Sequence, residues 1–315
     1  MQELKRKYLR YAFYLFATLT VLMIIGSFLD LPISRLLYPG HESSLGQFFT
    51  AFGELPAFMA ISCAGVLLVV RRGTANKLWS ALIGFGGGAL VLAANVLCIH
   101  EAVDSVSVLP VGVAILVSLF CSVVTGAGVL YLSRKASNKT VLRFALTLAF
   151  VAIGTMFLIN VIKIPWGRVR MRLIVQSGNE TYFTPWWQAG SAIKDKLIAD
   201  GISKDEFRSF PSGHTGCAAC AMLLLLLPTV YPRGYKHSHW FFIGGCAWTL
   251  AVAIARISMG AHFLTDVTMS CIIMGAVGVV GVWLFYFNPK FFNLIWRLIT
   301  TSDGGVFASE DSYEG

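Results

Sequence analysis

The sequence predicts an all-α fold: a polytopic helical bundle in a membrane, with about eight transmembrane helices. Two observations support this prediction. Hydrophobic residues make up 56% of the chain and charged residues 13%, whereas about 25% of residues are charged in an ordinary soluble domain. Long apolar runs also recur along the chain, and each approaches the roughly 20 residues that a helix needs to cross about 30 Å of hydrocarbon. The mean hydropathy of +0.70 agrees with both.

Eight segments have this length and composition. The first follows a basic N-terminal stretch, and we expect it to be retained, because no convincing small-residue cleavage site follows it. The second contains Glu54 and Pro56 near its start. Between these two segments, residues 31–49 are expected to form a loop with a short interfacial helix. The predicted spans are residues 11–29, 50–70, 79–99, 109–132, 144–162, 213–231, 240–257 and 264–286.

Basic residues predict the orientation. The 25 Lys and Arg residues favour short loops on the side of the N-terminus, and most of the others lie in one long connection, 163–211. Since Lys and Arg in short loops mark the cytoplasmic side, both termini are expected in the cytoplasm. The net charge of +9 forms no stripe that would indicate nucleic acid as a partner. The size and simplicity of the chain favour a bacterial inner (plasma) membrane.

The connection 163–211 has two notable parts. Its aromatic residues, which include Trp186 and Trp187, either anchor the protein at the headgroup boundary or line an entrance for lipid. Residues 191–208 are expected to form an amphipathic helix. Outside this connection, the seven Cys residues lie within apolar runs and are expected to be buried thiols. The chain from Ser302 onward is acidic and rich in Gly and Ser, which predicts disorder.

Three polar clusters interrupt the apolar chain where hydrophobic runs begin or end. They are Lys163 to Arg170, Ser209 to His214, and Arg256 to Asp266. In the predicted topology all three face the extracytoplasmic side. Ionisable residues at such positions are costly to keep, so they indicate a functional site.

The third cluster predicts an oriented histidine. His262 and Asp266 are four residues apart and would share one face of a helix. Asp266 would accept a hydrogen bond from one ring nitrogen, which leaves the other nitrogen unprotonated, as a nucleophile requires. A tight turn would bring Arg256 beside this ring, where its planar guanidinium suits phosphate oxygens.

The second cluster predicts the start of a helix. Ser212 suits the N-cap position, and Gly213 permits close approach to the backbone. The N–H groups of the first turn would then form an anion site. His214 stands in the same turn, where it can give or take a proton.

The first cluster adds positive charge. Lys163, Arg168 and Arg170 follow the fifth predicted span, and Gly167 allows the chain to bend so that these cations reach inward. Together the clusters suit phosphoryl transfer to His262 followed by hydrolysis. His214 would protonate the departing oxygen. No carboxylate cluster suited to Mg²⁺ is visible among the motifs, so neither a metal nor another cofactor is expected.

These motifs resemble the signatures of a known family. Lys163-x6-Arg170, Ser209-Phe-Pro-Ser212-Gly213-His214 and Arg256-x5-His262-x3-Asp266 are similar to those of the type 2 phosphatidic acid phosphatase (PAP2) superfamily, in its membrane lipid phosphatase branch. The resemblance covers roughly residues 145–286. It implies a six-helix core with two additional N-terminal helices, and metal-independent hydrolysis of lipid phosphates or diphosphates. Of the residues, it implies catalytic roles for His262, His214 and Asp266, and substrate binding by Lys163, Arg170, Ser212, Gly213 and Arg256.

Two positions depart from the family pattern. Met171 stands where the family usually has Pro, and Ala255 where it usually has Ser. Neither position carries a reactive group, so activity is expected to survive. The expected organisation is an N-terminal membrane segment of about four transmembrane helices (1–143), a PAP2-like region with the catalytic motifs (144–290), and a cytoplasmic, partly disordered tail (291–315).

The expected function is that of a membrane lipid phosphatase that forms a phosphohistidine. Candidate substrates are polyprenyl diphosphate, phosphatidate, phosphatidylglycerophosphate and phosphorylated glycolipid. Two alternatives remain open at this point: a lipid phosphotransferase that uses the same site, and a phospholipid transporter that only binds the phosphate. The complete pair of histidines with an acidic partner argues against the transporter, because binding alone needs no oriented nucleophile. The sequence indicates no oligomeric state.

Overall fold

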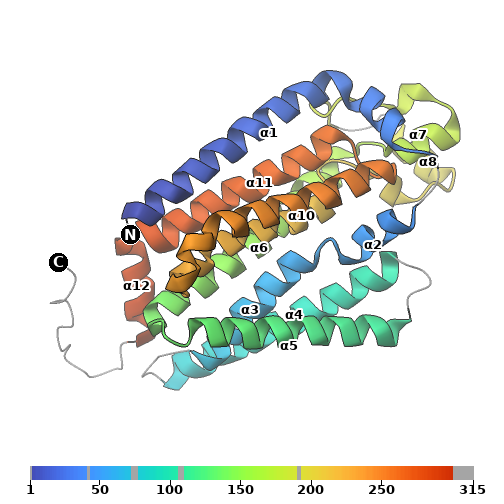
Figure 1. The fold of residues 1–315 in the computed structure, drawn as a ribbon. Coiled ribbons are helices and arrows are strands. Elements are labelled where there is room, and N and C mark those ends of the chain that lie inside the picture. The colour runs from blue at the N-terminus through green and yellow to red at the C-terminus, as the bar shows by residue number, and fades with distance from the viewer. Residues whose placement is uncertain (1, 41–42, 72–76, 106–109, 190–192, 301–315) are drawn as a thin grey trace.

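The computed structural model describes residues 2–40, 43–71, 77–105, 110–189 and 193–300. These residues form helices and turns and contain no strand, which confirms the all-α prediction (Figure 1). The long helices lie side by side in one elongated bundle. The N-terminus and α12 (Pro289–Thr300) are at one end of the bundle. At the other end are α2 (Ser44–Phe52), α7 (Met171–Ser177) and α8 (Lys194–Ala199) (Figure 1).

Seven helical stretches in the described residues are long and apolar enough to cross a membrane by length and composition. They correspond to seven of the eight predicted spans, and they are typical of an integral membrane protein. Their helices are α1 (Gln2–Leu37), α2 and α3 (Ser44–Phe52 and Leu55–Val70), α4 (Lys77–Ser105), α5 (Val111–Ser133), α6 and α7 (Asn138–Trp166 and Met171–Ser177), η4 and α10 (Pro232–His237 and Ser238–Ser258), and α11 and η5 (Leu264–Val282 and Trp283–Phe287).

The eighth predicted span, 213–231, has fewer helical residues than the others. It consists of α9 (Gly213–Ala219) and the 3-10 helix η3 (Cys220–Thr229). A 3-10 helix rises about 2.0 Å per residue and an α-helix about 1.5 Å. The two segments together therefore extend about 30 Å, which is close to the thickness of the hydrocarbon layer.

Helix α1 is longer than predicted. It continues through Asp30 and Pro32 to Leu37, where a loop was expected to begin at residue 31. The charge of Asp30 does not end the helix, because its side chain is buried against Arg168. The expected interfacial helix is α2, whose N-cap Ser43 accepts a hydrogen bond from the Gly46 N–H at 3.0 Å. Helix α2 ends at Phe52, two residues before Glu54, which precedes α3.

The long connection holds short helices instead of the single amphipathic helix expected at 191–208. Two of them, α8 and η2 (Lys204–Phe207), lie in that stretch. Gly201, at a φ of 93°, separates them, because this left-handed conformation ends a helix. Residues 190–192 of the expected helix lie outside the described residues, as does the chain from residue 301 for which disorder was expected. The remaining helices are α8 (Lys194–Ala199), η1 (Glu180–Tyr182), η2 (Lys204–Phe207) and α12 (Pro289–Thr300).

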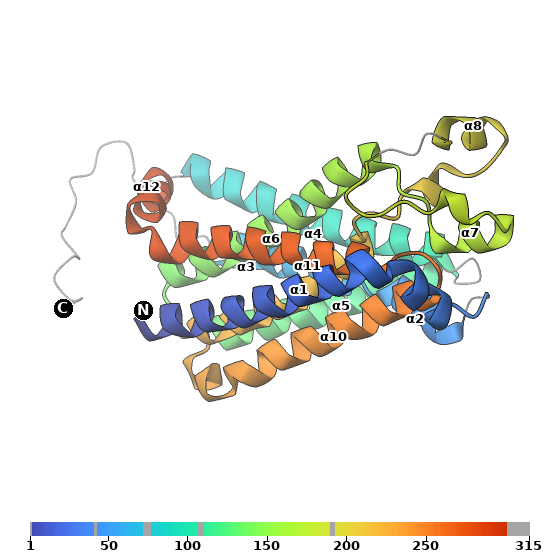
Figure 2. The ribbon, with the colours of Figure 1, turned by 90° about the horizontal axis from the view of Figure 1, so that it is seen from above.

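The bundle is held by close helix contacts inside and is apolar outside. Helix α1 lies along α11, and α3 packs between α4 and α6 (Figures 1 and 2). Gly65 and Gly87 mark the contact of α3 with α4: an added Cβ on either would lie 2.4 or 2.7 Å from the carbonyl oxygen of the other. Large side chains such as Phe28 and Phe85, each 80% exposed, cover the outer surface. Such a surface fits hydrocarbon and not water.

Candidate active site

His214 lies in the first turn of α9, as the sequence predicts. Ser212 precedes the helix in an extended conformation, and its hydroxyl accepts a hydrogen bond from the Thr215 N–H at 3.4 Å. Gly213 allows a neighbour to approach, because an added Cβ would lie 3.3 Å from Lys163 Nζ. The predicted helix start is therefore present, with a basic side chain directly beside it.

His262 lies in the turn between α10 and α11, and not on a helix as the spacing suggested. Its Nδ1 is 2.6 Å from the backbone carbonyl oxygen of Ser209 and 3.8 Å from Asp266 Oδ2. A carbonyl oxygen only accepts, so Nδ1 donates the hydrogen bond, and Nε2 of the neutral ring carries no proton. The expected tautomer is present, but Ser209 and not Asp266 accepts the hydrogen bond that selects it.

Asp266 supports this turn from behind. Its Oδ2 accepts hydrogen bonds from the Ser209 hydroxyl at 2.5 Å and the Phe263 N–H at 2.8 Å. Its Oδ1 accepts from Arg168 at 2.5 Å. The carboxylate therefore holds Ser209 and Phe263, which lie on either side of the His262 ring, in place. Its negative charge lies within 4 Å of that ring.

The His262 ring is 1% exposed, and burial lowers its pKa. Arg256 and Lys163 lower it further, since a second positive charge nearby disfavours protonation, while Asp266 opposes them. The ring is therefore neutral near pH 7, which is the state in which a histidine nitrogen can act as a nucleophile.

Three cations, two at helix ends and one just before a helix, line the same cavity as the histidines. Lys163 comes from the last turn of α6, Arg170 precedes α7, and Arg256 comes from the last turn of α10. Arg256 Nη1 donates to the Thr50 hydroxyl at 2.6 Å. The Nε atoms of Arg170 and Arg256 are buried, and no described residue accepts a hydrogen bond from them. These donors are available to an anion, because unsatisfied buried donors are costly.

These side chains line one polar cavity of about 540 Å³. The structure thus brings together both histidines, the three cations and Gly213, while Asp266 and Ser212 support the wall from behind. Of the predicted site residues, the lining includes Lys163, Arg170, Gly213, His214, Arg256 and His262.

Arg168, grouped with these cations in the sequence, has another position. Gly167, at a φ of 71°, ends α6 and bends the chain as predicted. The Arg168 guanidinium then lies between α1 and α11, where Nη2 is 2.9 Å from Asp30 Oδ2 and Nη1 is 2.5 Å from Asp266 Oδ1. Arg168 is 1% exposed, so this pair of carboxylates balances a buried charge.

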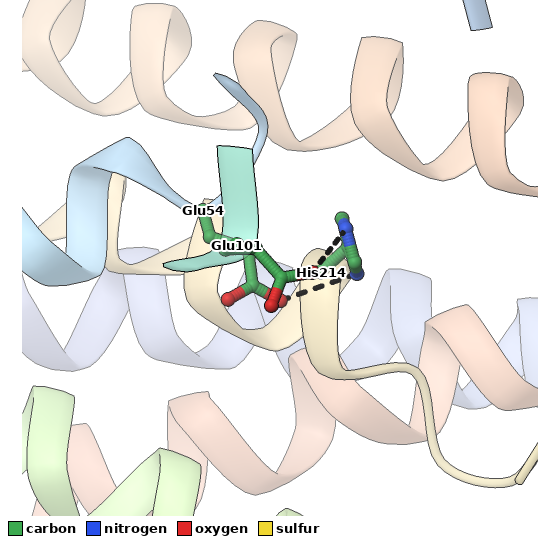
Figure 3. Close-up of side chains that lie close together, drawn as sticks. All are labelled: Glu54, Glu101 and His214. Atoms are coloured by element: carbon green, nitrogen blue, oxygen red, sulfur yellow. Dashed lines mark ion pairs between the residues drawn. The ribbon is translucent and has the colours of Figure 1, made fainter. Parts of the chain in front are cut away.

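Sequence reasoning missed two acidic residues beside His214. Glu54 Oε1 is 3.2 Å from His214 Nδ1, and Glu101 Oε1 is 3.2 Å from His214 Nε2. Figure 3 shows both carboxylates turned toward the ring. A carboxylate within an apolar run is a signal that could have singled out Glu54. Glu101 lies just past the predicted end of a span, where a charge is ordinary.

The same three residues are a possible metal-binding group. Among the described residues, one ligand atom each from Glu54, Glu101 and His214 lie within 4.8 Å of one another. The geometry suits proton binding by the ring better than metal binding. The two carboxylates face different ring nitrogens, and a metal ion would bind only one of these nitrogens. The cations Lys163 and Arg256 in the same cavity also repel a metal ion.

Comparison with known proteins gives one match. Residues 144–290 match the model of the PAP2 superfamily. No curated protein and no solved structure matches the chain. The matched residues include all three polar clusters, whereas Glu54, Glu101 and Thr50 precede them.

Proposed function

Because residues 144–290 form a PAP2 superfamily domain, and members of this superfamily are generally phosphatases, we propose that this membrane protein is a metal-independent lipid phosphatase. The observation that carries the proposal is the cavity in which His262, His214 and three cations converge. A phosphate group needs both positive charge and hydrogen-bond donors, and the cavity offers both.

The proposed reaction has two steps. In the first, His262 Nε2 attacks phosphorus, the P–N bond forms as the bond to the leaving oxygen breaks, and His214 gives its proton to that oxygen. In the second, water attacks the phosphohistidine, His214 takes a proton from the water, and phosphate leaves with both histidines restored. General acid–base help of this kind contributes about 10²–10⁴-fold to the rate.

The other predicted residues have supporting roles in this proposal. Lys163, Arg170 and Arg256 bind the phosphate oxygens and stabilise the charge that spreads over them in the transition state. Gly213 and Ser212 present the first-turn N–H groups of α9 to the same oxygens. Asp266 positions His262 through Ser209.

We further propose that the cavity opens on the extracytoplasmic side, where the distribution of Lys and Arg in short loops puts it. The candidate substrates are those that can lie in that leaflet with a terminal phosphate: polyprenyl diphosphate, phosphatidate, phosphatidylglycerophosphate or phosphorylated glycolipid. A lipid phosphotransferase would use the same first step and replace water by a second lipid.

The test is a phosphate-release screen of the purified full-length protein in detergent against a panel of these lipids. Release of phosphate from at least one lipid, and its loss in His262→Ala, is expected. No release from any lipid would reject the phosphatase, and transfer of labelled phosphate to a second lipid would identify the phosphotransferase instead. EDTA is expected to leave the rate unchanged. Complete loss with EDTA, restored by Mg²⁺, would reject the metal-independent reaction.

A further inference from the structure

The segment that precedes the PAP2 domain contributes side chains to the cavity. Glu54 lies at the break between α2 and α3, and Glu101 lies near the end of α4. Their carboxylates flank the two nitrogens of His214, each at 3.2 Å (Figure 3). The Thr50 carbonyl oxygen is also 3.1 Å from His214 Nε2. Each ring nitrogen therefore faces oxygen atoms of the N-terminal segment.

This arrangement matches the charged form of the ring. A neutral imidazole has one N–H, whereas the imidazolium has two, and an ionised carboxylate or a backbone carbonyl can only accept. Acceptors at both ring nitrogens are thus satisfied together when His214 carries both protons. That form is the acid which the proposed first step requires.

The surrounding charges explain why such a pair is needed. Burial of the ring opposes protonation of His214, positive groups close to it oppose it further, and the two carboxylates beside the ring act in the other direction. The charged and titratable groups that face His214 are Glu54 from the α2–α3 break, Glu101 from α4, Lys163 from α6, Arg170 from the start of α7, Arg256 from α10 and His262 from the turn before α11.

We propose that Glu54 and Glu101 are positioning residues for His214, which together orient its ring and hold it in the form that protonates the leaving oxygen. The inference rests on the proposed function. It gives the N-terminal segment 1–143 a role in the reaction, since that segment supplies the carboxylates and the PAP2 domain supplies the ring.

Glu54→Gln and Glu101→Gln test this role, because the amide keeps the shape of the side chain and removes its charge. Each variant is assayed with the lipid monoester hydrolysed fastest in the panel, whose leaving oxygen needs a proton, and with p-nitrophenyl phosphate, whose leaving group departs without one. We expect kcat for the lipid to fall about 10- to 100-fold, within the range of general acid help. KM for the lipid and the rate with p-nitrophenyl phosphate should change little.

The matched control is Glu180→Gln. Glu180 is an exposed carboxylate in the long connection, paired with Arg35, and this variant should retain both activities. Glu54 is nearly buried, so its substitution tests folding as well as charge. The Glu101 side chain is 30% exposed, and Glu101→Gln therefore keeps the proposal testable if Glu54→Gln unfolds. Thermal unfolding in detergent monitors all three variants.

Two results would overturn the positioning role. Equal losses with both substrates, or no loss with either, would show that the carboxylates do not act through the proton of His214. Wild-type activity that EDTA abolishes and Zn²⁺ or Mg²⁺ restores, together with loss of this response in Glu101→Gln, would make them metal ligands. The proposed function fails separately, through full activity of His214→Ala or no phosphate release by the wild type.

Discussion

The PAP2 domain and the segment before it contribute opposite charges to the same cavity. The domain lines it with His214, His262, five Lys or Arg residues and one carboxylate, that of Asp205, whereas the N-terminal segment lines it with His100 and the carboxylates of Glu54, Glu101 and Asp104. Like charges gathered in a low-dielectric site repel one another strongly. The motifs therefore hold the two histidines and much of the positive charge, whereas most of the carboxylates that offset this charge in the cavity come from helices outside the matched region.

The largest expected effect lies within the domain itself. His262→Ala should abolish phosphate release, because no nucleophile remains, and His214→Ala should reduce it by about 10²–10⁴-fold. Trapping of a phosphorylated enzyme by rapid quench separates the two, since only the second variant can still form the intermediate. Full activity in either variant would break the assignment of the reaction to the motifs.

The next effect tests the connection between the two regions. Arg168→Met leaves the carboxylates of Asp30 and Asp266 buried without their partner, and should destabilise the protein by about 3–5 kcal/mol. Thermal unfolding in detergent measures it. The double variant Arg168→Met with Asp30→Asn should lose less. Arg35→Ala, which breaks an exposed ion pair, is the control and should cost about 0–1 kcal/mol. Equal losses in the two Arg variants would contradict the buried pair.

A smaller effect concerns Thr50, which links α2 to Arg256, one of the residues proposed to bind phosphate. Thr50→Val removes the hydrogen bond of 2.6 Å between them. Because a hydrogen bond to a charged group is worth about 1.5 kcal/mol or more, KM for the lipid should rise about tenfold. Thr20→Val removes an exposed hydroxyl of α1 that bonds only within its helix, and should leave KM unchanged. An unchanged KM in Thr50→Val would remove α2 from substrate binding.

The last effect is a dependence of stability on pH. Burial lowers the pKa of His262 in the folded protein below its ordinary value of 6.5, so the unfolded chain binds more protons below that pH. Stability contributed by the neutral ring is present above pH 6.5 and is lost as pH falls, by at most about 1.4 kcal/mol per pH unit. His262→Gln should show a weaker loss between pH 6.5 and 4.5 in thermal unfolding. An identical loss would mean that His262 is not buried in the neutral form.

Local patterns in the sequence predicted most of the fold. Apolar runs identified the spans, and Ser212 with Gly213 identified the start of α9. The length of α1 was not predictable in the same way. Asp30 resembles a helix end until Arg168, 138 residues later in the chain, is known to be its partner. Contacts at such a separation have no signal in a local pattern.

For the candidate site, the sequence predicted which residues lie together better than it predicted their individual partners. Spacing correctly placed both histidines and three cations together, since each follows or precedes a span on one side. It gave His262 the wrong hydrogen-bond partner, because the helix begins only at Leu264 and the backbone of Ser209 comes closer than Asp266 does. Spacing also grouped Arg168 with the other cations. In the structure it lies apart from them, because neighbours in sequence point in different directions once Gly167 bends the chain.

The ion pairs of Arg168 also set an order of assembly. Asp30 is synthesised early, yet its partners are residues 168 and 265, so its carboxylate must wait for more than two hundred further residues before its last hydrogen bonds form. Helix α1 is thus locked in place by residues that lie far later in the chain. A chain that ends before residue 265 therefore lacks the N–H and the hydroxyl of Thr265, which donate hydrogen bonds to the Asp30 carboxylate.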